Sequence, residues 1–547
     1  MTTQTVTPDR SPLAPERESF WHLVHAEWTK FRTVRGWVIA AGVTIAAIAG
    51  GAFLGTDVSG GCAGGRASGA ASAAACPVQP TGPGGVPVVD AFYFAHQPVT
   101  GNGTITAAVT SLTGQVEAGQ AGNGAPRMGP GLQPWSKAGI IIKQNTSPGS
   151  AYAAMMVTGS HGVRMQWDYV NDTPGLVQGA GAGGLGRWVG RVSVSAPRWL
   201  RLVRDADTIT GHDSADGTHW TRVAAATLPG LTSTVQAGLF AAGSYYESSR
   251  CTYDSNFCTR AIGVFRHIRL SWPATGWTGT NVGGYANATG TPLPGTLRQS
   301  AATTTVAGFG DISPAAGNAY GGSGQSLQRA LAGTLAGLIP LIVVAAMFIT
   351  AEYRRGLIRV SLIAAPRRGR LLAAKAVAIG AVGFVAGLAA ATLALAAGAP
   401  RLRRAGGLEW PVSLLTEARM AAGTGALLAV AAVLALAIGT IVRRSALAVA
   451  VVIVVVVVPY LLAFGPLPGS QPQGSGPGGG GGWPLQITPA AAMSLQQAVP
   501  QFHQLIAVYP LQAGYYPLAP WAGLAVECAW AAAALALAYY LLRRRDA

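Results

Sequence analysis

The chain has 547 residues, of which 50% are hydrophobic and only 11% are charged. Soluble globular proteins carry about 25% charged residues, so this composition excludes an ordinary soluble protein and indicates surface that faces lipid. The net charge is +17, but the basic residues gather at the ends of apolar segments and not among aromatic residues, which favours membrane topology signals over nucleic-acid binding.

Residues 1–36 are predicted to form a cytoplasmic tail followed by an amphipathic helix. Between residues 20 and 35, aromatic and aliphatic side chains recur near helical spacing with charges between them. This pattern is typical of a helix that lies on a membrane surface. Residues 37–54 follow as the first membrane span. This apolar segment is longer than the apolar part of a typical signal peptide, so we interpret it as a span and not as a cleaved leader.

A long segment separates the first span from the second, and its composition changes twice. Residues 55–86 and 273–330 are rich in Gly, Ala, Ser, Thr and Pro, and we predict that both are linkers. Between them, residues 87–272 contain short segments of alternating hydrophobicity separated by turn signals. Many short strands at even spacing predict an all-β sandwich, inserted between spans one and two.

Four of the five cysteines lie in this long segment, as the neighbouring pairs Cys62 with Cys76 and Cys251 with Cys258. In an oxidising compartment this spacing is compatible with two short-loop disulfides. No Cys-x-x-Cys spacing of a zinc site occurs, and we expect no metal site in the chain.

Five further apolar segments are long enough to cross a membrane. They are residues 331–350, 376–397, 420–442, 446–464 and 521–542. The fourth and fifth spans are separated only by Arg443, Arg444 and Ser445, so they are predicted to form a hairpin. The expected fold is therefore a six-helix transmembrane bundle carrying a jelly-roll sandwich. Beyond the fifth span, residues 488–503 are predicted to form a short helical cover on the outer face.

The basic residues indicate an orientation for these spans. If the spans alternate, the clusters before span one, between spans two and three, between spans four and five and after span six share one side. The positive-inside rule makes that side the cytoplasm. Both termini are then on the cytoplasmic side of the plasma membrane, and residues 55–330 are on its outer side. The loop at 465–520, on the opposite side, has no Lys or Arg, whereas Arg401, Arg403 and Arg404 disagree with the scheme.

Several runs in the predicted sandwich, among them Trp135 to Lys143 and Thr208 to Trp220, resemble a concanavalin-A-like, or laminin-G-like, jelly roll. The resemblance implies a two-sheet fold of a kind that often binds carbohydrate, and a protein ligand is the other possibility. Four tryptophans could stack on sugar rings, although such residues more often belong to a sandwich core. They are Trp135, Trp167, Trp199 and Trp220.

The junction after the second span reads Phe348-Ile-Thr-Ala-Glu-Tyr-Arg-Arg-Gly-Leu-Ile-Arg359. Together with Glu27-Trp-Thr-Lys-Phe-Arg32, it resembles type-2 ABC exporter permeases over residues 18–55 and 328–547. The resemblance implies a permease homodimer or heterodimer with a separate ABC ATPase subunit, on which ATP and Mg would bind. The candidate residues of the ATPase-coupling loop are Glu352, Arg354, Arg355, Gly356, Arg359, Arg367, Arg368 and Arg370. Within this loop, Glu352 could pair with Arg355 or Arg359 at helical spacing.

The chain itself contains no Gly-x-x-x-x-Gly-Lys-Ser/Thr loop that could hold nucleotide phosphates, so we expect no bound cofactor and no enzymatic activity in it. Glu527 is the one acid inside a predicted span, and such carboxylates are usually functional or face a cavity. It lies about two turns from the outer end of the span, so access to water is an equally good explanation. The alternatives to an exporter are a non-transporting membrane sensor with a lectin-like domain and, less favoured, a membrane-anchored carbohydrate hydrolase, which would need paired carboxylates that the sequence lacks.

Overall fold

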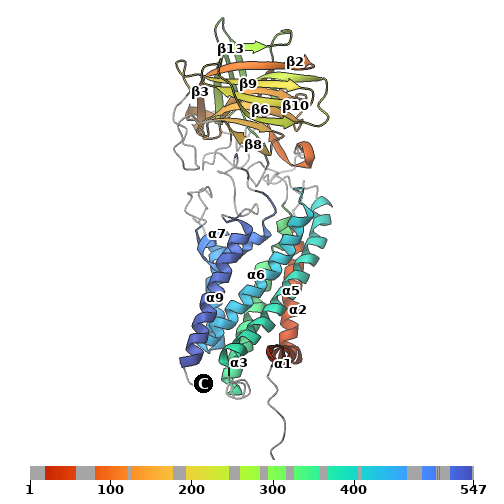
Figure 1. Ribbon diagram of the computed structural model, residues 1–547, viewed down its shortest axis with the longest axis vertical. Helices are drawn as coiled ribbons and strands as arrows, with labels where there is room; N and C mark the ends of the chain where they lie inside the picture. Colours follow the sequence, from red (N-terminus) through yellow and green to blue (C-terminus); the bar gives the residue numbers. More distant parts are fainter. Residues whose placement is uncertain are drawn as a thin grey trace, which may run out of the picture.

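A computed structural model places a helical bundle and an all-β sandwich one above the other along the long axis of the molecule (Figure 1). It describes residues 19–56, 80–120, 126–175, 192–244, 259–283, 294–315, 326–357, 367–404, 410–464, 483–500, 502, 504, 516 and 518–544.

The bundle contains the six predicted spans. Its helices are α1 (Phe20–Thr33), α2 (Arg35–Thr56), α3 (Thr334–Arg354), α5 (Arg368–Arg404), α6 (Leu414–Val442), α7 (Ser445–Phe464), α8 (Pro484–Ile487) and α9 (Pro520–Arg544), with the 3₁₀ segments η3 (Leu327–Leu331) and η4 (Pro489–Gln496). The helices α2, α3, α5, α6, α7 and α9 are long and apolar enough to cross a membrane. Arg443, in the left-handed conformation at φ 63°, ends α6, and α7 begins two residues later, which gives the predicted hairpin.

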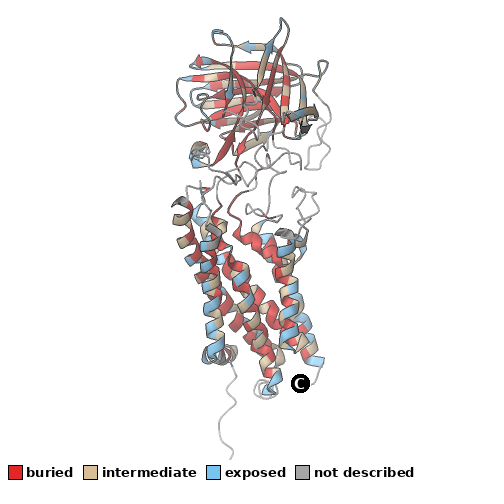
Figure 2. Cartoon of the chain, turned by 180° about the vertical axis from the view of Figure 1, so that it is seen from behind, coloured by how far each residue is buried: buried red, intermediate tan, exposed pale blue. Residues whose placement is uncertain are grey.

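The helices of the bundle carry exposed and partly exposed residues as well as buried ones (Figure 2), and many of the exposed residues are apolar. The clearest case is α7, which has a mean hydropathy of 2.8 while only 22% of its span is buried. Its exposed residues include Val454, Leu461 and Leu462. Contiguous apolar surface of this extent is rare on soluble proteins, so these faces are suited to contact with lipid.

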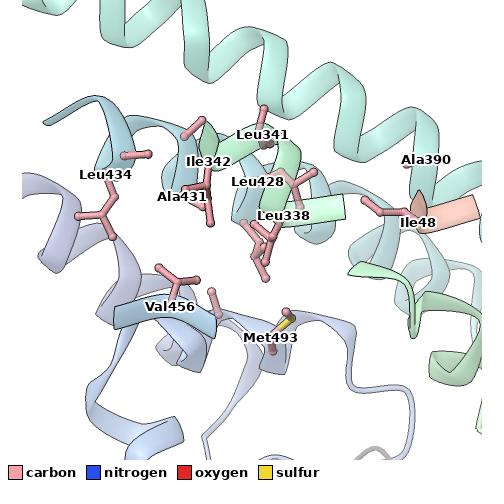
Figure 3. Close-up of a cluster of buried hydrophobic side chains, with 14 of the residues drawn as sticks. Ile48, Leu338, Leu341, Ile342, Ala390, Leu428, Ala431, Leu434, Val456 and Met493 are labelled. Carbon is pink, nitrogen blue, oxygen red and sulfur yellow. The ribbon is translucent and has the colours of Figure 1, made fainter. Parts of the chain in front are cut away.

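Inside the bundle, helices approach closely where small residues meet. A Cβ atom added to Gly387 of α5 would lie 2.9 Å from the Cα of Gly425 in α6, which is the close backbone contact that small residues permit in membranes. Larger side chains from α2, α3, α6, α7 and η4 fill the centre (Figure 3). They include Ile48, Leu338, Leu341, Ile342, Leu428, Leu434, Val456 and Met493.

The η4 segment is part of this centre. Every residue from Pro489 to Gln496 is buried, and η4 packs against α6, α7 and α9. The Nε2 of Gln496 donates hydrogen bonds to the Oγ1 atoms of Thr334 and Thr424, at 2.8 and 3.0 Å. The helical cover predicted for residues 488–503 is therefore wrong in its position, because this segment inserts between the spans and its polar groups find partners there.

The sandwich is antiparallel throughout. Its strands are β1 (Val88–Asp90), β2 (Phe92–Thr100), β3 (Gly103–Gln120), β4 (Pro126–Pro130), β5 (Lys137–Lys143), β6 (Tyr152–Thr158), β7 (Val163–Trp167), β8 (Asn171–Pro174), β9 (Arg198–Asp205), β10 (Thr208–Ser214), β11 (Thr221–Thr227), β12 (Thr234–Ala242), β13 (Thr259–Leu270), β14 (Thr278–Val282), β15 (Thr296–Gln299), β16 (Thr304–Phe309) and β17 (Ile312–Pro314), preceded by the 3₁₀ turn η1 (Pro83–Gly85). The larger sheet has the order β11-β10-β9-β3-β13-β16-β15, with β4 paired to β3, and the smaller sheet has the order β14-β2-β12-β5-β6-β7-β8.

The smaller sheet is buried on both faces. Along β6, Met155 belongs to the core between the two sheets, whereas Tyr152 and Met156 belong to a second cluster on the other face. Val88 of β1 and Ile312, the first residue of β17, complete that second cluster, and β1 pairs with β17. This ribbon therefore covers a face of the sheet that would otherwise be open to water.

The linker predicted for residues 273–330 is wrong in its extent. Strands β14 to β17, within residues 278–314, pair with the sheets of the sandwich or with β1. These strands are rich in Thr and Gly, and Thr suits a strand through its branched side chain although it resembles linker composition. The sandwich therefore extends well beyond Trp272.

The chain between η4 and α9 contacts the sandwich. The Nε2 of Gln504 donates a 2.9 Å hydrogen bond to the backbone oxygen of Tyr169, and both residues are buried. The rings of Trp410, before α6, and Phe502 lie 5.7 Å apart. The segment that inserts into the bundle therefore continues directly into a contact with the sandwich.

Candidate functional site

Four charged side chains from three helices meet at the end of the bundle remote from the sandwich, where α1 lies beside α3 (Figure 1). The Nζ of Lys375, in α5, lies 2.8 Å from an oxygen of Glu27, in α1, and 2.7 Å from an oxygen of Glu352, in α3. The Nζ of Lys30, in α1, binds the same two carboxylates at 2.8 and 3.2 Å. These four residues, the ion quartet, join α1, α3 and α5 in one network.

The ion quartet is largely excluded from water. The side chains of Lys375 and Glu27 are 1% and 3% exposed and that of Glu352 is 10% exposed, whereas Lys30 is 42% exposed. Two carboxylates and two ammonium groups leave no net charge, as buried charges require. Burial lowers the pKa of Lys30, but Glu27 and Glu352 raise that pKa by more, so it stays above its ordinary value.

Local sequence explains why α1 docks in this way. The side chain of Ser19 caps the first turn of α1, and the buried residues of the helix are Glu27 and Phe31. Their spacing of four places both on one face. The Phe31 ring lies 6.4 Å from that of Phe348 in α3, so an aromatic contact and the ion quartet hold the same face of α1.

The predicted coupling residues divide into two groups. Arg354, Arg355, Gly356, Arg367 and Arg370 are exposed on either side of the loop between α3 and α5, and the four arginines among them are named here the exposed arginine rim. Residues 358–366, with Arg359, lie outside the described residues. Gly356 has φ 69°, a left-handed conformation that favours glycine where α3 ends.

Two of the predicted residues make contacts other than those expected. Glu352 binds Lys30 and Lys375 and not Arg355, because the fold brings two distant lysines into the place where a neighbour in sequence was expected. Arg368 donates to the backbone oxygen of Leu542 at 2.5 Å, so it caps the last turn of α9, where a cation is favourable.

Sequence reasoning missed Glu27, Lys30 and Lys375 as members of the site. The sequence contained a signal for Glu27, because this acid lies on the apolar face of the predicted amphipathic helix. Lys375 is a second example, since it interrupts an otherwise apolar run. Charges in such positions need partners, but the pairing itself is long-range.

Glu527 is buried inside the bundle. The residue is 1% exposed, and neither carboxylate oxygen has a hydrogen-bond partner among the residues that the structure describes. One turn earlier in α9, Gly523 packs against Ala491 and Ser494 of η4. No group of three or more metal-binding side chains is present in the described part of the chain.

The four tryptophans occupy different environments. Trp135 is buried and stacks on His161 at 4.0 Å, and Trp167 packs against the core between the sheets. Trp199 and Trp220 are partly exposed, and both contact Gly217. The Trp199 ring packs against Gly217, and the Trp220 Nε1 donates a hydrogen bond to the Gly217 backbone oxygen. The four cysteines predicted to form disulfides lie outside the described residues.

Comparison with known proteins relates the membrane part of the chain to a family. One solved structure, titled "The crystal structure of a functionally unknown protein from Saccharomyces cerevisiae", matches 33% of this chain and 74% of that chain at 15% identity, with a TM-score of 0.19. No curated protein matches. Residues 279–547 match the family model described as "ABC-2 family transporter protein". These residues hold five of the six spans, so the membrane part of the chain is similar to the ABC-2 family of transporter proteins.

Proposed function

We propose that this multi-pass membrane protein is the permease subunit of an ATP-driven exporter and works with a separate ATPase subunit as a homodimer or heterodimer. The ion quartet is the observation that carries this proposal, together with the family match of residues 279–547. A permease of this kind must pass a force from a cytoplasmic partner to several spans at once. The ion quartet joins three helices at one end of the bundle, where such a force would arrive.

The exposed arginine rim is the proposed docking surface for the ATPase. Arg354 and Arg355 follow shortly after Glu352, and Arg367, just before α5, and Arg370, in its first turn, precede Lys375. A force on this rim is therefore transmitted to Glu352 and Lys375, the two residues that bind α1 through the ion quartet. Because removing one partner of a buried ion pair costs about 3–5 kcal/mol, α1, α3 and α5 are expected to move together and not to separate.

The proposed sidedness follows from the arrangement of basic residues. The end of the bundle that carries α1, the exposed arginine rim and the end of α9 with Arg543 and Arg544 is the cytoplasmic end by the positive-inside rule. The sandwich at the opposite end is then outside the plasma membrane, where it binds carbohydrate or protein. A non-transporting sensor that displays the sandwich is the second candidate, and the absence of an ATPase partner would favour it.

Affinity purification of the tagged full-length chain from native membranes tests the proposal. We expect mass spectrometry to find a subunit with a nucleotide-binding P-loop in the eluate. The variant with Arg354, Arg355, Arg367 and Arg370 all changed to Ala should lose that subunit. Arg401→Ala is the matched control, because Arg401 lies at the other end of α5, over the Phe53 ring, and should retain it. If the wild-type chain never recovers such a subunit, the exporter proposal is wrong.

A further inference from the structure

Five neighbouring strands of the larger sheet, β11, β10, β9, β3 and β13, align a row that contains three arginines and a histidine. Directly paired residues of antiparallel strands lie on the same face. The register pairs Arg222 of β11 with His212 of β10, and His212 with Arg201 of β9. Arg201 in turn pairs with Thr106 of β3, and Thr106 with Arg269 of β13. The residues next to this row along their strands, such as Leu200, Leu202 and Ile105, belong to the core between the sheets. The row is therefore on the outer face.

Among the residues that the structure describes, no salt bridge neutralises Arg201, Arg222 or Arg269. The guanidinium of Arg201 lies 3.7 Å from the centre of the Trp220 ring, a contact that positions the group but leaves its charge. The Nε of Arg201 and the Nδ1 of His212 are buried without a hydrogen-bond partner in the described part of the chain. The Nε of Arg201 can only donate, and buried groups of this kind are normally paired, so its state points to a missing acceptor.

A second row extends the same surface. Arg266 of β13 pairs with Ala108 of β3, and Ala108 pairs with Trp199 of β9. The Trp199 ring stacks on His267 at 5.2 Å, and the Nε of Arg266 is buried and unpartnered among the described residues.

Three acids on or beside strands β9 and β10 are directed elsewhere. Asp213 follows His212 on β10 and therefore points to the opposite face of the sheet, and Asp216 pairs with His219 in the turn after that strand. At the other end of β9, Asp205 accepts a hydrogen bond from Asn102. Neither of the two paired rows contains an acid.

The dimensions of the surface suit a linear ligand. Strands in a sheet lie about 4.8 Å apart, so the row of five positions from Arg222 to Arg269 spans about 19 Å. A polymer with regularly spaced negative charges could contact several of these cations at once. The partly exposed indole rings of Trp199 and Trp220 beside the guanidinium groups favour a sugar polymer, because flat aromatic rings pack well on apolar ring faces.

We infer that this face, defined by Arg201, His212, Arg222 and Arg269 and named here the cationic face, binds a linear anionic polysaccharide whose acidic groups contact the guanidinium groups. The inference rests on the proposed function only in placing the sandwich outside the membrane, where such polymers occur.

Binding of fluorescent alginate, a linear polyuronate, to the purified full-length chain in nanodiscs tests the inference. The wild-type chain should bind alginate more weakly as salt rises, because exposed charges are screened, and it should not bind neutral dextran. Changing Arg201, Arg222 and Arg269 to Gln should weaken binding about tenfold or more, since three exposed ion pairs of up to about threefold each are lost. The control with Arg127→Gln and Arg298→Gln removes two exposed arginines of the same sheet outside the row and should bind as the wild type does.

Three outcomes would overturn the inference: equal alginate binding by the triple variant and the wild type, equal binding of dextran, or tighter binding of single-stranded DNA than of alginate. Wild-type far-ultraviolet circular dichroism for the triple variant is required, and single Arg→Gln variants replace it if its sandwich does not fold. Because no ATPase is present in this assay, its failure leaves the exporter proposal standing. Failure to recover an ATPase likewise leaves the alginate result intact.

Discussion

Changing Lys375 to Met tests whether the ion quartet is as dry as the structure indicates. Met keeps the length of the side chain and removes its charge. The two carboxylates of Glu27 and Glu352 would then share only Lys30, and one negative charge would remain uncompensated. Because the Lys375 side chain is 1% exposed and Glu27 is 3% exposed, we expect the free energy of unfolding to fall by about 3–5 kcal/mol, the usual cost of breaking a buried pair.

Two further variants make this expectation specific to the charges. Lys30→Met also leaves one carboxylate without a counter-charge, but it removes the 42% exposed member of the ion quartet, on the side that water reaches. Screening by water should therefore make its cost smaller than that of Lys375→Met. Lys375→Met combined with Glu352→Gln leaves Glu27 and Lys30 as a neutral pair. The double variant should therefore be more stable than the sum of the single effects predicts, with a coupling energy of about 0.5–3 kcal/mol.

Reversible unfolding in mixed detergent micelles, followed by tryptophan fluorescence, gives the free energies of the wild type, of the single variants Lys375→Met, Lys30→Met and Glu352→Gln, and of the double variant. Helical content before unfolding provides the control for gross misfolding. If Lys375→Met and Lys30→Met cost the same, water reaches Lys375 and the reasoning from burial fails. Additive effects in the double variant would show that Glu352 and Lys375 do not interact.

Two further predictions concern the sandwich and the bundle. Burial lowers the pKa of His96 from its ordinary value of 6.5, although a hydrogen bond to Gln236 raises this pKa in part. The unfolded chain therefore binds a proton at His96 more readily than the folded chain does. The stability of the folded chain is complete above about pH 6.5 and is lost as pH falls through the lower pKa of the folded state. Thermal unfolding of the purified chain between about pH 7 and pH 5 should show this loss, and His96→Gln should reduce it; an unchanged pH dependence would exclude His96 as its source. Gly387→Val should cost about 1–3 kcal/mol through overpacking against Gly425, whereas Gly42→Val should cost little, because nothing lies within 4 Å of a Cβ at Gly42; equal loss of stability in detergent would contradict the packing of α5 on α6.

The sequence was sufficient for the spans because hydropathy acts locally. The valine-rich α7 and the basic turn after α6 are visible in a short window, and the structure has both. Much of the sandwich was also predictable, since β5 and β6 alternate between two environments. The later strands were missed because Thr and Gly in β14 to β16 resemble a linker until their partners in other strands are known.

The candidate site was less predictable than the fold. The motif around Glu352 indicated the right part of the chain, but Lys30 is 322 residues away from Glu352 in sequence, and no local pattern pairs them. Arg368 lies in the same basic run as Arg367 and Arg370, and nothing in that run distinguishes it. Its contact with the end of α9 becomes visible in the folded structure. Long-range packing thus decides which charges are structural and which remain exposed for a partner.

Site-specific photo-cross-linking in native membranes tests most directly whether a nucleotide-binding subunit docks beside the ion quartet. A photoreactive residue in place of exposed Arg355, next to the loop between α3 and α5, should cross-link to a subunit with a P-loop. The same residue in place of Leu415, which is 83% exposed at the sandwich end of α6, should not. Cross-linking of such a subunit from Leu415 and not from Arg355 would contradict the account, as would its absence from both positions.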